Sequence, residues 1–90
     1  MGYKLFVMIK LQGATELQAK KFYDQLKSME WSLNERSKSQ WLCNFNSNVS
    51  RYNAYQLIIR DLNQAKMISN IKEAEYKINM DYVNIMSGMV

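Results

Sequence analysis

The chain has 90 residues, 48% of them hydrophobic, and twelve Lys or Arg against eight Asp or Glu give a formal net charge of +4. This length fits a single domain over residues 1–90, without room for a second hydrophobic core. The mild basic excess suits ordinary solubility and gives only a weak preference for anionic partners.

The side chains that most enzymes use are scarce. Histidine is absent and Cys43 is the only cysteine. These counts exclude Ser-His-Asp and Cys-His catalysis, an intrachain disulfide and a cysteine-based zinc site. We therefore expect a protein that is not an enzyme, with no catalytic residue, no metal and no cofactor.

The location is predicted from what the sequence lacks. No apolar run approaches the roughly 18 residues of a membrane span, and no signal-peptide pattern opens the chain. Lys, Asn, Ile, Met and Tyr are frequent, which is typical of AT-rich genomes such as those of phages. We expect a cytoplasmic protein of a bacterial or phage-infected cell, without a membrane partner.

The segment Tyr3–Leu11 alternates in hydropathy with a period of two. One parity holds Leu5, Val7, Ile9 and Leu11, and the other holds Lys4, Phe6, Met8 and Lys10. This pattern predicts a strand with one buried face, and the other segments can pack on it or pair with it.

A first amphipathic helix is predicted after Gly13. It begins at Ala14 or Thr15 and runs to about Met29. Its apolar sector holds Ala19, Phe22, Tyr23, Leu26 and Met29. Leu17 falls among the polar residues, so it is either an exposed apolar spot or a sign of a different register.

The second helix is predicted to begin at Ser50 or at Asn53, where Gln56 completes a capping-box pattern, and to end at Ile68 or Asn70. Asp61 falls inside its apolar arc. A catalytic carboxylate is conceivable there, but an unpaired buried charge is costly. We interpret Asp61 as a residue at the edge of the arc, bonded to a Lys, a Tyr or a backbone group.

Three further extended segments complete the pattern. Glu30–Glu35 and Gln40–Phe45 are predicted as two strands joined around residues 36–39, with Trp41 and Cys43 facing the core together with Phe45. Glu75–Met86 is a last extended segment, and its apolar parity switches after Tyr82. The switch indicates a bulge, a bend or two short strands, so residues 83–90 are an extended tail or an extra edge strand.

This order of elements predicts an α+β, ferredoxin-like βαββαβ fold. We expect a four-stranded antiparallel sheet of order 4-1-3-2 with both helices on one face. The face without helices would carry Lys4, Phe6, Met8, Lys10, Gln40, Leu42, Asn44, Lys77 and Asn79.

That helix-free face is the candidate binding site. Phe6, Met8 and Leu42 would be neighbours, with Lys4 and Lys10 at the rim, and an apolar centre with a polar rim suits docking or self-association. The alternative is an ordinary scatter of exposed apolar side chains. A second candidate is the last segment, which could add to an edge strand or form a dimer. Its residues are Tyr82, Val83, Ile85, Met86 and Met89.

Nucleic-acid binding is the alternative function. RNA-recognition modules of this topology stack bases on aromatic residues of the open sheet face. Phe6 could serve, but the third strand offers no aromatic residue there unless it is turned over to expose Trp41 and Phe45.

Two short segments resemble the acylphosphatase pattern: Leu11-Gln12-Gly13-Ala14 and Trp31-Ser32-Leu33-Asn34. That family holds phosphate with an arginine four residues beyond the loop glycine, and this chain has Leu17 there. The resemblance implies a shared topology without the activity, because no guanidinium is present to hold the transition-state charge.

In length and strand–helix order, and in Ser39-Gln40-Trp41-Leu42, the chain also resembles Cas2-like and VapD-like small nucleases. Those families carry an acidic residue for a metal ion near the end of the first strand. Here 8–12 holds neither Asp nor Glu, which argues against Mg²⁺-dependent cleavage. The resemblance still implies a symmetric homodimer, through the last strand and tail.

These considerations favour a non-enzymatic protein-binding module. Its size and composition are similar to those of small phage-encoded inhibitors, such as anti-CRISPR proteins, which occlude a larger partner. The partner would be another protein, with a homodimer as a further possibility.

Overall fold

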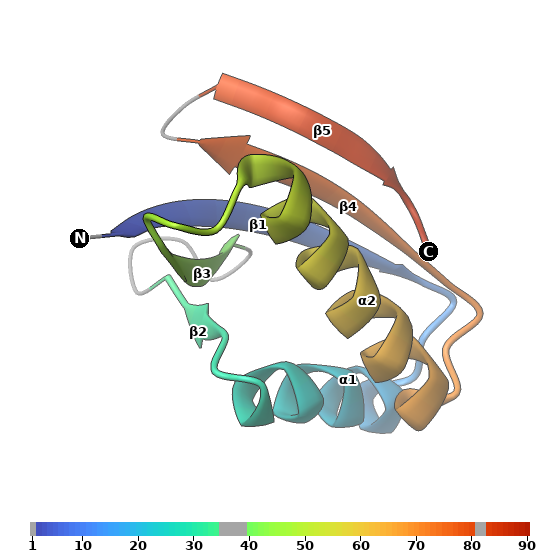
Figure 1. The fold of residues 1–90 in the computed structure, drawn as a ribbon. Coiled ribbons are helices and arrows are strands. Elements are labelled where there is room, and N and C mark those ends of the chain that lie inside the picture. The colour runs from blue at the N-terminus through green and yellow to red at the C-terminus, as the bar shows by residue number, and fades with distance from the viewer. Residues whose placement is uncertain (1, 35–39, 81–82) are drawn as a thin grey trace.

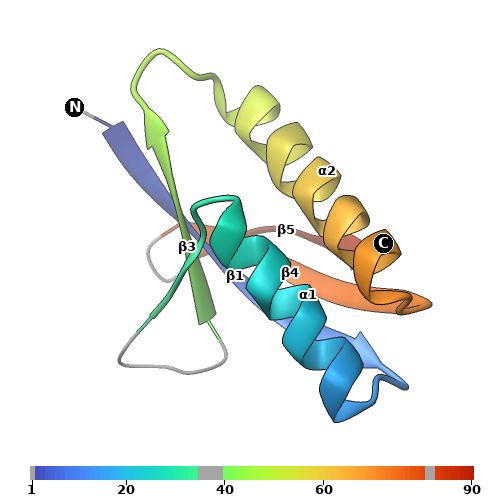
Figure 2. The ribbon, with the colours of Figure 1, turned by 90° about the horizontal axis from the view of Figure 1, so that it is seen from below.

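The computed structural model describes residues 2–34, 40–80 and 83–90. In chain order its elements are β1 (Gly2–Gln12), α1 (Glu16–Ser28), β2 (Ser32–Leu33), β3 (Gln40–Asn46), α2 (Arg51–Ser69), β4 (Glu73–Met80) and β5 (Val83–Met89). The described strands form a five-stranded antiparallel sheet of order β2-β3-β1-β4-β5. Both helices lie on one face of it (Figures 1 and 2).

The first four strands have the order 4-1-3-2, and the α+β arrangement is consistent with a ferredoxin-like fold. The expected number of four strands is wrong, because β5 pairs with the outer side of β4. The parity switch marks the place where the chain reverses: β4 ends at Met80 and β5 begins at Val83. The register shifts between Ile78 and Asn79, as in a β-bulge.

β1 lies at the centre of the sheet, between β3 and β4. Leu5 and Val7 are fully buried, whereas Ile9 and Leu11 are partly exposed and pack against the edge of the same core. The buried cluster combines side chains from the sheet and both helices, including Leu5, Val7, Phe22, Leu26, Trp41, Cys43, Ile58, Leu62 and Ile78. The aliphatic parity of β1 therefore faces the helices as predicted.

Local hydrogen bonds fix where each helix begins. Thr15 caps α1: its hydroxyl accepts from the Gln18 amide at 3.1 Å, and the Gln18 side chain accepts from the Thr15 amide at 3.0 Å. Ser50, not Asn53, caps α2, because Asn53 lies in the first turn and donates its amide to the Ser50 hydroxyl at 3.1 Å.

The second strand is shorter than predicted. We expected it over Glu30–Glu35, but β2 contains only Ser32–Leu33. Glu30 has a φ of 69°, and the Trp31 amide donates to the Leu26 carbonyl at 3.1 Å, so both residues form the capping turn that follows α1. Glu35 and the loop expected around 36–39 lie outside the described residues.

No helix within 2–34, 40–80 or 83–90 is long and apolar enough to cross a bilayer. α1 and α2 are instead amphipathic, with the polar residues of α1 facing outward and Leu17 exposed among them. The exposed position of Leu17 agrees with the first of its two predicted interpretations.

The core position Leu62 gives a first prediction. Leu62→Ala should lower the free energy of unfolding by about 2–5 kcal/mol, because it leaves a cavity in a fully buried site of α2. Leu17→Ala makes the same change at a helical residue that is 63% exposed, and should change stability by no more than about 0.5 kcal/mol. Urea unfolding followed by circular dichroism measures both, and equal effects would contradict the assigned core.

Candidate functional site

Phe6, Met8 and Leu42 lie together on the face of the sheet opposite the helices. Phe6 pairs with Leu42 across β1 and β3, and Met8 follows Phe6 by two residues on the same face. None of the three belongs to the side chains that pack against the core, and Met8 is 40% exposed. We call these three residues the apolar centre. Neither described helix covers it, as Figure 1 shows.

A polar rim surrounds the apolar centre. In the ladder between β1 and β4, Asn79 lies opposite Phe6, Lys77 opposite Met8, and Glu75 opposite Lys10. Lys4 pairs with Asn44 of β3. Lys4, Lys10 and Lys77 are exposed. The residues expected on this face are therefore brought together as predicted.

The fifth strand extends the same face beyond the predicted site. Met89 pairs with Glu75 and Ser87 with Lys77. Side chains of β1, β4 and β5 border a groove of about 620 Å³, lined by Met8, Lys10, Glu75, Lys77, Ser87 and Met89 among others. The sequence did not predict this groove, because it left open whether residues 83–90 pair with the sheet.

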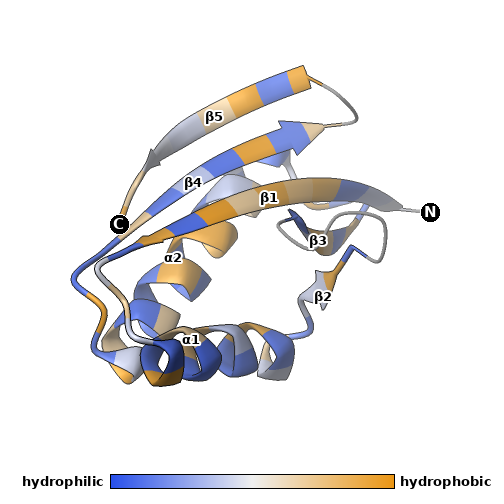
Figure 3. Cartoon of the chain, turned by 180° about the vertical axis from the view of Figure 1, so that it is seen from behind, coloured by the Kyte–Doolittle hydropathy of each residue, from blue (hydrophilic) through white to orange (hydrophobic). Residues whose placement is uncertain are grey.

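The segment expected to form an edge or a dimer is divided between two environments. Val83, Ile85 and Met89 are 62%, 40% and 51% exposed. Met86 is partly buried and packs against the core. Tyr82 lies outside the described residues. Figure 3 shows β5 along the outer edge of the sheet, with its first residues alternating between apolar and polar.

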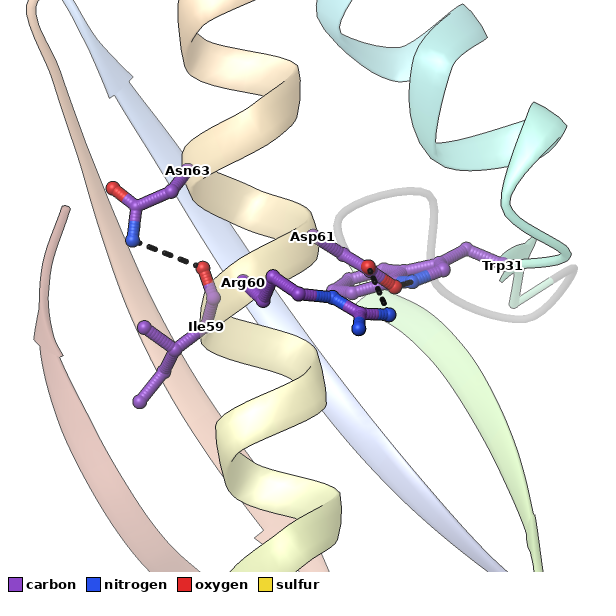
Figure 4. Close-up of polar contacts among 5 residues, drawn as sticks. All are labelled: Trp31, Ile59, Arg60, Asp61 and Asn63. Atoms are coloured by element: carbon purple, nitrogen blue, oxygen red, sulfur yellow. Dashed lines mark hydrogen bonds and ion pairs between the residues drawn. The ribbon is translucent and has the colours of Figure 1, made fainter.

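Asp61 lies in a second, smaller hollow between the end of α1, β3 and α2. The Trp31 indole N–H donates to Asp61 Oδ2 at 3.0 Å, and Arg60 Nη2 lies 3.6 Å from Asp61 Oδ1 (Figure 4). The expected partner, a Lys, a Tyr or a backbone group, is wrong, because the end of α1 brings the Trp31 ring to α2. Asp61 therefore provides the hydrogen-bond acceptor for the buried indole N–H at the edge of the core.

The surroundings of Asp61 do not resemble an acid–base site. Its side chain is 17% exposed and is held by Trp31 and the exposed Arg60. Figure 4 also shows Asn63, two residues further along the same helix, donating to the carbonyl of Ile59 one turn earlier at 3.2 Å, which is a local helix contact. The described part of the chain has no group of three or more His, Cys, Asp or Glu that could hold a metal ion.

Cys43 lies within the core and is 5% exposed. Burial raises the pKa of its thiol, and the negative charge of Asp61 raises that pKa further. A thiol in this state has little thiolate at neutral pH and is a poor nucleophile. The position fits the packing role predicted for Cys43.

Trp41 and Phe45, the two aromatic residues of β3, both pack in or against the core on the helix side of the sheet. Trp41 is 3% exposed and stacks on Tyr23 with ring centroids 5.4 Å apart. The open-face residues of β3 are Gln40, Leu42 and Asn44, so the apolar centre offers Phe6 as its aromatic side chain. A platform on which several bases stack is therefore not formed by the described residues of β1 and β3.

Comparison with protein-family models gives no match, and comparisons with curated proteins and with solved structures give no significant one. Any functional inference therefore depends on the geometry of this chain.

The buried thiol gives a second prediction. The pKa of the Cys43 thiol is higher in the folded state than in the unfolded state. The contribution of this group to the free energy of unfolding is therefore complete below the unfolded pKa of about 8.5 and is lost as the pH rises above it. Above that pH the free energy of unfolding should fall by up to about 1.4 kcal/mol per pH unit. Cys43→Ala should remove this part of the slope. Burial also raises the pKa of Tyr23, so a smaller loss near pH 10 should remain.

Urea unfolding at several pH values between about 7 and 9.5 measures this slope. If the original chain and Cys43→Ala lose stability at the same rate over that range, the buried and protonated thiol is not the cause.

Proposed function

We propose that this chain is a non-enzymatic protein-binding module that docks on its partner through Phe6, Met8 and Leu42. The observation that carries the proposal is the position of this apolar centre on β1 and β3, on a face that neither described helix covers. An apolar centre that excludes water, within a polar rim that stays hydrated, is the usual anatomy of a docking surface.

The rim suggests the chemistry of the partner. Lys4, Lys10 and Lys77 are exposed around the apolar centre. Glu75 is partly engaged by the Gln12 side chain, which donates to it at 2.9 Å. A partner surface with an apolar patch bordered by Asp or Glu would match this arrangement and would be steered toward it.

The site needs little ordering before it binds. Phe6 and Met8 alternate with the fully buried Leu5 and Val7, so their backbone is fixed from both sides by the sheet and from beneath by the core. A preformed surface loses less conformational entropy on binding than a flexible one. This favours inhibition by occlusion, in which the small domain covers a functional surface of a larger protein, as anti-CRISPR proteins do.

Affinity capture from the source cell, followed by mass spectrometry, tests the proposal. Phe6→Glu combined with Met8→Glu should abolish recovery of the partner, because two carboxylates replace the apolar centre. Far-UV circular dichroism and the melting temperature should stay close to those of the original chain.

Leu17→Glu combined with Met67→Glu is the matched control. It makes the same change of charge at two helical residues that are 63% and 77% exposed, on the other side of the molecule. The control should retain the partner. Equal recovery with both double variants would exclude the apolar centre as the docking site.

The nucleic-acid alternative predicts a different result. A labelled single-stranded RNA would bind with an affinity that falls steeply with salt, and loss of Lys4 and Lys10 would weaken it. Absence of binding at low salt would leave protein docking as the remaining candidate.

A further inference from the structure

The groove bordered by β1, β4 and β5 has a regular lining. Three consecutive residues of each strand line it, at 8–10, 75–77 and 87–89. Side chains alternate along a strand, and of the middle residues Ile9 packs against the core and Tyr76 is buried in it. The middle residues therefore give the groove a floor of backbone. Its walls are the side chains of Met8, Lys10, Glu75, Lys77, Ser87 and Met89.

The floor has no free backbone group along β4. This strand is hydrogen-bonded to β1 on one side and to β5 on the other, and 75–78 pair regularly with 86–89. A peptide laid across the floor would bury its own amide groups without partners, which costs free energy. An aliphatic chain has no such groups. The volume of about 620 Å³ is within the usual range of small-molecule sites.

The apolar part of the walls consists of two methionines. Met8 on β1 is 40% exposed, and Met89 on β5 is 51% exposed. A thioether side chain is flexible and polarizable, and it adapts to the shape of a neighbouring chain. Tyr76, the aromatic residue among the lining residues, turns its ring to the core. The groove therefore suits an aliphatic chain better than a flat ring.

The charged part of the walls has an excess of one positive charge. Lys10 lies opposite Glu75 and Lys77 opposite Met8, so the two lysines are diagonal neighbours, a relation that typically spans about 7–8 Å. Neither ammonium group forms an ion pair within the described chain. The Glu75 carboxylate accepts from the Gln12 side chain instead. Two ammonium groups can thus reach one anionic group between them, with one carboxylate nearby.

We propose that this groove binds a small aliphatic monocarboxylate of the fatty-acid type. Its carboxylate would lie between Lys10 and Lys77, and its chain would contact Met8 and Met89. One negative charge balances the excess in the groove, and the lining has no arginine fork to favour a phosphate. Ser87, opposite Lys77, adds a hydroxyl donor. This site goes beyond the proposed function and does not rest on it.

Methionine methyl NMR of the full chain tests the site. The chain, labelled with ¹³C at its methionine methyl groups, is titrated with dodecanoate below its micelle concentration. The signals of Met8 and Met89 should shift and saturate together. Met67 is 77% exposed on α2, and its signal should stay in place. Equal shifts of all three signals would mean adsorption to any exposed apolar side chain and would overturn the proposal.

The role of charge is tested with a second ligand and two variants. Dodecyltrimethylammonium has the same chain with the opposite charge and should bind at least about tenfold more weakly. Lys10→Gln with Lys77→Gln should weaken dodecanoate binding about tenfold, because two charge-assisted contacts are lost. Lys21→Gln with Lys27→Gln removes the same charge from exposed positions of α1 and should leave binding unchanged. Equal weakening by both double variants, or equal affinity for both ligands, would overturn recognition of the carboxylate.

A protein occupant of the groove gives a different pattern. If dodecanoate shifts no methionine signal and Met89→Gln abolishes partner capture, the groove belongs to protein docking and the proposal is overturned. The titration contains only this chain and the ligand, so its failure leaves docking through the apolar centre untouched. Unchanged partner capture with Phe6→Glu and Met8→Glu would likewise leave the ligand site untouched.

Discussion

The burial of Leu5 and Val7 at the centre of the sheet is the constraint on which the other features depend. Both side chains are fully buried against the helices, and β1 is paired on both sides. Because a strand alternates its side chains between two faces, fixing these two residues inward fixes Phe6 and Met8 outward. A one-residue slip of β1 would place aliphatic side chains in water and remove the apolar centre.

The two edge strands of the described sheet differ in how much unpaired backbone they have. β2 contains only Ser32–Leu33, because the residues before it end α1, and so it offers little backbone to another strand. β5 is longer, uncharged and free along its outer side within the described chain. The described sheet thus has one short edge, one longer edge and one face without helices, and β5 of the longer edge borders a groove on that face.

Polar groups near the core have structural explanations. Asp61 accepts from the Trp31 indole, and the buried Cys43 stays protonated because burial raises its thiol pKa. No buried side-chain N or O atom among the described residues lacks a hydrogen-bond partner.

The sequence alone determined the alternating row of β1, the two helices and the order 4-1-3-2 of the first four strands. The row and the helices follow from side-chain periodicity, which is local, and the strand order follows from the right-handedness of crossover connections. The structure decided between Ala14 and Thr15 as the start of α1, since Thr15 is its cap. The tertiary structure decided that residues 83–89 form β5, that Trp31 meets Asp61, and that β1, β4 and β5 border one groove. Each of these joins segments distant in the chain, and hydropathy patterns carry no information on which distant segments meet.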